Sequence, residues 1–321
     1  MLNQSYVGLD IGTKKVKIVK MKNSNILSIS SFFVPEKVME NETIVDPETL
    51  GVELGKVTKE LGIKNGKTIV SIGNQLYSKI IEMPQLKKKE LREATIYQAL
   101  KSFPIHLEDI EIDVCPVRKI KSGTETKIEV LAVAAPAKHL VEIETICKIA
   151  NLDLIAIEPE PVALYRILGS QSDITEGILN IGGSRSLFSI YKKGILHSVR
   201  AIQFGCSAFY QNNDNVDTLE QVDAEDPANL LLIKDIATSL SRSLEYFKVQ
   251  ESEEIEKITI CGGGAKLKNI DKFLKKELGL NVDKASYESK VSLRPSVHKG
   301  LGDESLQDFV VAIGLAMRKK V

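Results

Sequence analysis

YVGLDIGTKKVKIVKM, residues 6–21, places two apolar runs on either side of a short polar turn that begins with glycine. Such runs are typical of two β-strands joined by a tight turn. Asp10 lies near the end of the first run, so its carboxylate is expected to project toward whatever the turn holds. The turn, Gly12–Lys15, offers backbone N–H groups, one hydroxyl and two ammonium groups. It is able to hold a phosphate, although the pattern also fits an ordinary β-hairpin.

The chain repeats this pattern in its second half. From Ile178 the sequence reads ILNIGGSRSLFSIYKKGIL, and Leu179–Gly182 aligns with Leu9–Gly12 without a gap. Each copy continues through a second apolar run and a short polar turn into a third apolar run. Two similar β-meanders in one chain predict two related halves that face each other.

A third glycine-rich turn lies within Ile258–Leu278, ITICGGGAKLKNIDKFLKKEL. An apolar strand is expected to end at Gly262–Gly264 and to lead into a helix with apolar residues at helical spacing. Three glycines leave bare backbone near a helix N-terminus, where a flat ring or a phosphate could lie. A tight turn without a ligand is the alternative.

Composition argues against several classes of protein. Lysine plus arginine balances aspartate plus glutamate at 43 each in 321 residues, so nothing indicates a general nucleic-acid-binding protein. The four cysteines and four histidines are dispersed, which argues against a disulfide scaffold or a zinc site. The opening MLNQS is no secretion leader, and no apolar run approaches the ~20 residues that cross a bilayer. We therefore expect a cytosolic protein without direct membrane insertion.

The region after Pro84 predicts an insertion in the first half. Its expected elements are a helix, two strands and a second helix, at Lys87–Phe103, Ile110–Arg118, Lys127–Ala134 and Ala137–Ala150. A polar turn around Gly123 would join the two strands. This order indicates a small α/β subdomain.

The remaining helices are predicted from apolar spacing and from proline. Strand Leu152–Ile157 is expected to lead into a helix that begins at Pro161. Because Glu158 and Glu160 alternate along an extended path, only one of them is expected to face a cleft between the halves.

In the second half, the acidic stretch Gln211–Pro227 is predicted to be a mobile loop because it is poor in apolar residues. Asn229–Phe247 and Leu306–Lys319 are predicted to be helices.

Two facing meanders with a glycine-rich strand-to-helix turn resemble the actin-like ATPases, an α/β fold of two ribonuclease H-like domains shared with sugar kinases and heat-shock chaperone ATPases. The resemblance implies that the first and second turns grip the phosphates of ATP and their Mg²⁺, with Asp10 holding the Mg²⁺ through water. It implies that the glycine turn packs on the adenosine and that Glu160 with Pro161 forms a hinge. The implied nucleotide-binding residues are Asp10, Gly12, Thr13, Lys14, Asn180, Gly182, Gly183, Ser184, Gly262, Gly263, Gly264 and Lys266.

The same resemblance implies the limits of the domains. These are residues 1–83 and 152–172 for the first ribonuclease H-like subdomain, with a C-terminal helix at 306–321 packed back on it, 84–151 for the small inserted α/β subdomain, and 173–305 for the second domain, with a reduced helical insert near 212–256.

Within this group the chain resembles the type IV pilus assembly protein PilM family nearly from end to end. The stretches that carry the resemblance are GLDIGTKKVKIV at 8–19, FPIHLEDIEIDV at 103–114, VAAPAKHLVEIETICKIANLDLIAIEPEPVALYRIL at 133–168, SRSLEYF at 241–247, CGGGAKL at 261–267 and VVAIGLAM at 310–317. The cell-division protein FtsA carries its insertion at the same place, but its pattern adds a C-terminal amphipathic membrane-targeting helix. The sequence up to Val321 shows none, which favours PilM.

The PilM resemblance implies a cytoplasmic protein that binds ATP and docks the short cytoplasmic tail of the inner-membrane protein PilN. The tail is expected in a groove between the first subdomain and the insertion. The partner would recruit the protein to the cytoplasmic face of the inner membrane, beside other proteins of the alignment complex. A homodimer is also compatible with the resemblance.

The sequence departs from the family pattern at two places. Asn180 stands where the second phosphate turn normally has aspartate, and an amide contributes no negative charge to hold Mg²⁺ or orient water. Losing such help typically costs ~10²–10⁴-fold in rate. After Phe204-Gly205 the Ala-Glu-x-x-Lys motif that touches the ribose is replaced by the acidic stretch. ATP binding with little hydrolysis is therefore expected. The alternatives are a small-molecule kinase of the same superfamily and a filament-forming protein like FtsA.

Overall fold

The computed structural model describes residues 4–40, 42–72, 76–103, 109–122, 125–170, 172–211, 219–293, 297, 301 and 304–318. The predicted turn at Gly123, residues 212–218 of the predicted acidic loop and residues 319–321 of the predicted last helix lie outside these ranges. No helix in the described ranges is long and apolar enough to cross a bilayer.

A six-stranded sheet organises the first half, in the order β10-β6-β1-β2-β3-β16. Its strands are β1 (Tyr6–Ile11), β2 (Lys15–Lys22), β3 (Asn25–Phe33), β6 (Lys67–Ile72), β10 (Asp153–Pro159) and β16 (Ser292–Leu293). The first three form an antiparallel meander, and β6 and β10 continue the sheet in parallel beside β1. One face is covered by α1 (Pro47–Glu60), α3 (Ala137–Ile149) and the short hairpin of β4 (Met39–Glu40) and β5 (Thr43–Ile44).

A five-stranded sheet organises the second half, in the order β13-β12-β11-β14-β15. Its strands are β11 (Thr175–Ile181), β12 (Ser186–Lys192), β13 (Ile195–Ile202), β14 (Lys257–Cys261) and β15 (Asn281–Lys284). The meander β11-β12-β13 is antiparallel, and β14 and β15 run parallel beside β11. The sequence repeat thus corresponds to one five-strand topology that occurs twice.

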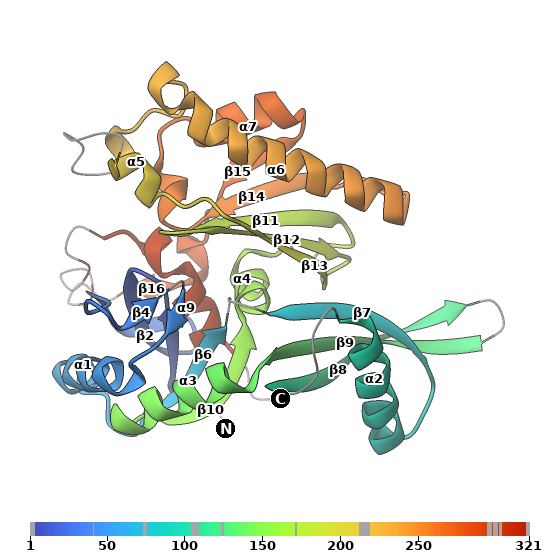
Figure 1. The fold of residues 1–321 in the computed structure, drawn as a ribbon, viewed down its shortest axis with the longest axis horizontal. Coiled ribbons are helices and arrows are strands. Elements are labelled where there is room, and N and C mark those ends of the chain that lie inside the picture. The colour runs from blue at the N-terminus through green and yellow to red at the C-terminus, as the bar shows by residue number, and fades with distance from the viewer. Residues whose placement is uncertain are drawn as a thin grey trace.

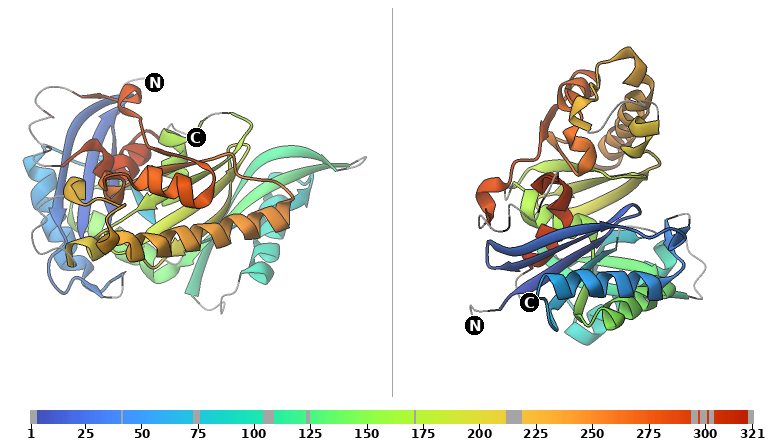
Figure 2. Two further views of the ribbon diagram at one scale, coloured as in Figure 1. Left: turned by 90° about the horizontal axis from the view of Figure 1, so that it is seen from above. Right: turned by 90° about the vertical axis from the view of Figure 1, so that its left-hand side faces the viewer.

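Two helices lie between the sheets and belong to one shared core. They are α4 (Glu160–Leu168) and α9 (Val310–Ala316), which pack with residues of β2 and β3 on one side and of β11 and β12 on the other. Figure 1 shows both helices between the second sheet above and the first sheet below. On the outer face of the second sheet lie α6 (Pro227–Glu251) and α7 (Ile270–Leu278), as Figure 2 also shows.

The inserted part is a three-stranded antiparallel sheet, β7-β9-β8, with α2 (Lys88–Ser102) on one face. Its strands are β7 (Tyr77–Pro84), β8 (Ile110–Ser122) and β9 (Glu125–Pro136). Two features differ from the expected limits at 84 and 151. β7 belongs to this sheet, because Ile81 and Met83 alternate into its core. Helix α3 packs on α1 and β10 instead, because Ile143 and Ile146 face the core of the first half.

Several ends of elements also differ from the expectations. The long helix α6 begins at Pro227, two residues earlier than predicted, because the Asp226 side chain caps it by accepting a hydrogen bond from Ala228 N. The glycine turn is followed by a 3₁₀ turn, η3 (Gly263–Lys266), before α7 begins at Ile270. The last helix is shorter than predicted, with a 3₁₀ turn, η5 (Leu306–Phe309), ahead of α9. The remaining short elements are α5 (Ser207–Gln211), η2 (Leu219–Gln221) and η4 (Glu288–Lys290).

Candidate functional site

A pocket between the two halves is lined by the ends of β1 and β11 and by the turns that follow them. The two turns have the same backbone geometry. Gly12 N donates a hydrogen bond to the carbonyl of Lys15 at 3.1 Å, and Gly182 N donates to the carbonyl of Arg185 at 3.0 Å. Seven of the residues predicted from the sequence line this pocket, namely Asp10, Gly12, Thr13, Asn180, Gly182, Gly183 and Ser184.

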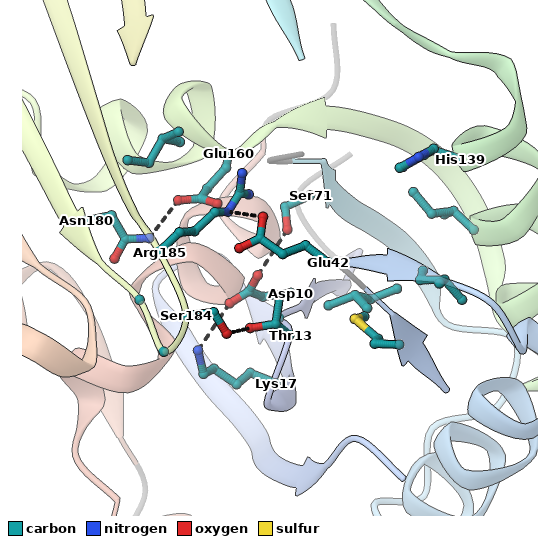
Figure 3. Close-up of a pocket in the computed structure, with 18 residues that line it drawn as sticks. Asp10, Thr13, Lys17, Glu42, Ser71, His139, Glu160, Asn180, Ser184 and Arg185 are labelled. Carbon is teal, nitrogen blue, oxygen red and sulfur yellow. Dashed lines mark hydrogen bonds and ion pairs between the residues drawn. The ribbon is translucent and has the colours of Figure 1, made fainter. Parts of the chain in front are cut away.

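Asp10 is buried at the centre of the pocket and both of its carboxylate oxygens have partners. Ser71 on β6 donates to Oδ1 at 3.1 Å, and the Lys17 ammonium lies 3.4 Å from Oδ2 (Figure 3). Burial by itself lowers the pKa of Lys17, but the charges of Asp10 and Asp308 outweigh it and leave the pKa above its usual value. Lys17 therefore remains charged and balances Asp10.

Asn180, the matching residue of the second half, faces Glu160 at the start of α4. Its Nδ2 donates a hydrogen bond to Glu160 Oε1 at 2.6 Å. Burial raises the pKa of Glu160 above its usual value, and the charge of Asp10 raises it further. The neighbouring Glu158 points elsewhere and forms ion pairs with Arg166 and Arg318. Only Glu160 of the two thus faces the pocket.

Three contacts join the second turn to the first half across the pocket. The hydroxyls of Thr13 and Ser184 are 2.7 Å apart, and a side chain at Gly183 would meet the aliphatic chain of Lys14 at 3.2 Å. The third contact is an ion pair of 3.7 Å between Arg185 Nε and Glu42 Oε2. Figure 3 shows Arg185 reaching from the second half toward Glu42, close to Glu160.

The other predicted residues, Lys14, Gly262–Gly264 and Lys266, do not line this pocket. The glycine turn packs behind it. A Cβ on Gly262, which has φ of 81°, would lie 2.1 Å from Asn180 Oδ1. A Cβ on Gly264 would lie 2.1 Å from Ile181 Cγ2, so both glycines are required for close packing against β11. Lys266 forms an ion pair of 2.5 Å with Asp308.

The sequence analysis missed several residues of the pocket, among them Lys17, Glu42, Ser71 and Arg185. The position of Lys17 could have been predicted from the sequence. In a tight hairpin the residue opposite Asp10 is Lys17, so the register alone would have paired them. Glu42 and Ser71 come from other elements, and only the tertiary structure brings them here.

The pocket fits a phosphate chain better than it fits a metal ion held by the protein alone. It offers the N–H groups of two glycine turns, the hydroxyls of Thr13 and Ser184 in those turns, and the cations Lys17 and Arg185. Among the described residues, no group of three His, Cys, Asp or Glu side chains could hold a metal. Asp10 is a pocket carboxylate that could hold a Mg²⁺ ion through water.

A second depression, a groove of about 630 Å³, lies between the inserted sheet and the first half. Its walls are β8, β10 and helix α3. Among the described strands, β8 and β10 are each an edge strand of their sheet. Val141 on α3 and Ile155 on β10 line it with half-exposed to exposed apolar side chains. Its acidic residues are Glu111, Asp113 and Glu144, of which Asp113 pairs with Arg92.

Comparison with known proteins gives the fold and the family. The structure resembles a PilM–PilN type IV pilus biogenesis complex with a TM-score of 0.82 and 22% identity, over 97% of this chain and 97% of that chain. It resembles the ethanolamine utilization protein EutJ from Carboxydothermus hydrogenoformans with a TM-score of 0.55 and 13% identity, over 99% and 90%. It resembles MreB 5 of Spiroplasma citri bound to AMPPNP with a TM-score of 0.52 and 12% identity, over 97% and 94%.

These likenesses confirm the predicted actin-like α/β fold. A profile of the family described as type IV pilus assembly protein PilM matches residues 8–320, nearly the whole chain. The chain therefore belongs to the type IV pilus assembly protein PilM family.

Proposed function

We propose that this chain docks the cytoplasmic tail of a PilN-type membrane protein in the groove between β8, β10 and α3. The observation that carries the proposal is a groove between two edge strands. Exposed apolar side chains and acidic side chains line this groove. An extended peptide is able to pair with such a strand through its backbone while its apolar side chains enter the groove. The acidic residues Glu111 and Glu144 favour a tail that carries basic side chains.

The pocket between the halves is the proposed ATP site, with Mg²⁺ bound through the phosphates. The phosphate-binding groups described above support this assignment, as does the AMPPNP bound to the similar MreB 5 structure. We further propose that hydrolysis is slow. Asp10 is already paired with Lys17 and Ser71, and Glu160 accepts from Asn180, so neither of these two carboxylates is free to orient water.

Helix α3 supports a link between the two sites. Its residues His139 and Ile143 line the nucleotide pocket, whereas Leu140 and Val141 line the groove. If the nucleotide binds one position of α3 more tightly than another, it shifts the protein toward that position. The largest change in tail affinity that it can cause is set by the ratio of its own affinities for the two positions.

The proposal also covers the protein's place in the cell. The tail of the partner would hold the protein at the cytoplasmic face of the inner membrane, where it would meet other alignment-complex proteins or a second copy of itself.

The test is a fluorescence anisotropy titration of a labelled peptide that copies the partner's cytoplasmic tail, with and without Mg-ATP. Saturable binding is expected. Val141→Asp and Ile155→Asp should each raise Kd about 30-fold or more if these side chains are central contacts. Leu231→Asp is the matched control, because Leu231 is exposed on α6 away from the groove. No binding by the wild-type protein, or equal binding by all variants, would refute docking at this groove.

A further inference from the structure

We propose that Arg185 binds the phosphate chain of the nucleotide and that it does so by exchanging its partner Glu42 for phosphate. This inference rests on the proposed ATP site and deepens it. It adds a residue of the second turn that neither the glycine pattern nor the hydroxyls of the turns had indicated.

The position of Arg185 follows from the geometry of the turn. Its carbonyl accepts the hydrogen bond from Gly182 N, which fixes its backbone at the end of the second turn. Its side chain is largely buried, with 17% exposed, and lines the pocket beside Gly183 and Ser184. A guanidinium held here reaches the space that both turns enclose.

Of the two cations in the pocket, Arg185 is the one that can exchange its ion-pair partner more readily. Among the residues that the structure describes, the lysine and arginine side chains that line the pocket are Lys17 and Arg185. Lys17 is tied to the buried Asp10, whose charge it balances. Arg185 faces Glu42 at 3.7 Å, which is within ion-pair range but longer than a normal hydrogen bond.

Phosphate is a better partner for this guanidinium than the Glu42 carboxylate at that distance. The planar fork of arginine binds phosphate oxygens with two parallel hydrogen bonds, which are short and charge-assisted. The second turn also lacks the negative charge that an aspartate at position 180 would add, so nothing in the turn itself repels a phosphate. Glu42 comes from the β4–β5 hairpin of the first half and therefore competes with the nucleotide for the same cation.

The competition predicts opposite effects of two substitutions on ATP binding. Arg185→Gln should weaken ATP binding about tenfold or more, because it removes charge-assisted hydrogen bonds to phosphate. Glu42→Gln should strengthen it roughly two- to fivefold, because it removes a competing ion pair of modest strength. A gain in affinity cannot result from misfolding, so the second variant protects the test against a folding artefact.

The experiment is isothermal titration calorimetry of the full chain with Mg-ATP. The variants are Arg185→Gln, Arg185→Lys, Glu42→Gln and the double variant Arg185→Gln with Glu42→Gln. Arg185→Lys keeps the charge and should recover part of the affinity. The gain from Glu42→Gln should vanish in the double variant. Lys79→Gln, an exposed lysine on the inserted sheet, is the control for a general loss of positive charge.

The outcomes separate this inference from the proposed function. Wild-type protein that binds ATP, together with Arg185→Gln that binds it equally well, would overturn the role of Arg185 and leave the ATP site standing. A Glu42→Gln variant with unchanged or weaker ATP binding would overturn the exchange of partners. Wild-type protein that binds no ATP would overturn both the ATP site and this inference, whereas tail docking would still be decided by the peptide titration.

Discussion

The hairpins β1–β2 and β11–β12 have the same backbone but different charges. Both turns close with the same hydrogen bond from glycine, at 3.1 Å and 3.0 Å. Asp10 ends the first strand opposite Lys17, whereas Asn180 ends the second strand opposite Leu187. The carboxylate thus occurs where the hairpin supplies a cation, and the amide occurs where it supplies none.

This difference shows what a buried carboxylate requires. A buried charge is costly unless it is paired and hydrogen-bonded. Lys17 and Ser71 meet that need for Asp10. At position 180 the side chain contacts the carboxylate of Glu160, so an amide donor is favourable and a second carboxylate is not.

The largest expected effect concerns a position where the two repeats differ in the size of the side chain. Gly8 on β1 aligns with Ile178 on β11 in the sequence repeat, and α9 packs directly on β1. A Cβ on Gly8 would lie 1.9 Å from the carbonyl oxygen of Ala312. Gly8→Ala should therefore lower the free energy of unfolding by about 3 kcal/mol, measured by urea denaturation.

Gly55→Ala in α1 is the control for Gly8→Ala. Its Cβ would make only an ordinary contact of 3.6 Å with Ala150 Cα, so it should be neutral or stabilise by about 0.5–1 kcal/mol. If Gly8→Ala unfolds at the same urea concentration as the wild type, the close approach of α9 to β1 is not a feature of the protein in solution.

The second expected effect comes from making the two hairpins alike. Asn180→Asp replaces the donor to Glu160 with a second carboxylate that has no cation across the strand pair. The free energy of unfolding near neutral pH should fall by about 2 kcal/mol. The loss should shrink in acid, because one of the two carboxyl groups then takes up a proton and donates to the other.

Asn180→Ala separates the two causes of that loss. It removes the hydrogen bond without adding charge. Because that bond lowers the pKa of Glu160, the loss in Asn180→Ala should also depend on pH, but less steeply than the loss in Asn180→Asp. The comparison of both variants by thermal unfolding across pH tests the explanation. A pH-independent loss in Asn180→Asp would show that repulsion from Glu160 is not its source.

The smallest expected effect is the pH dependence that Glu160 gives to stability. Its pKa is raised in the folded state, so the folded protein binds the proton more tightly than the unfolded chain does. Stability should therefore fall as pH rises from the ordinary glutamate pKa through the raised one, by at most about 1.4 kcal/mol per pH unit. Glu160→Gln still accepts a hydrogen bond from Asn180 and should abolish this slope, which makes it more stable than the wild type at high pH.

Glu158→Gln is the neighbouring control for Glu160→Gln. It weakens the pairs with Arg166 and Arg318 and should destabilise the protein. Unfolding of both variants is followed by circular dichroism from acid to alkaline pH. A Glu160→Gln variant whose stability keeps the wild-type slope would assign that slope to another group.

Much of the fold was predictable because it depends on local patterns. The apolar runs and glycines of the two hairpins, the apolar stripe of α6 and the end-to-end family resemblance all indicated the observed elements. The limits of the insertion were less predictable. The apolar faces of β7 and α3 could belong to either the insertion or the first half. Only the packing decides that β7 joins the inserted sheet and that α3 packs on α1.

The sequence by itself determined two hairpins with glycine turns, their repeat and the absence of a carboxylate at position 180, because these depend on residues adjacent in the chain. The tertiary structure alone decided which side chains surround the turns. Ser71, Glu42 and Glu160 reach the pocket from separate elements, and β8 and β10 meet α3 to form the groove. Contacts between distant segments depend on how sheets and helices pack, and a single sequence records that packing only through the sum of many small interactions.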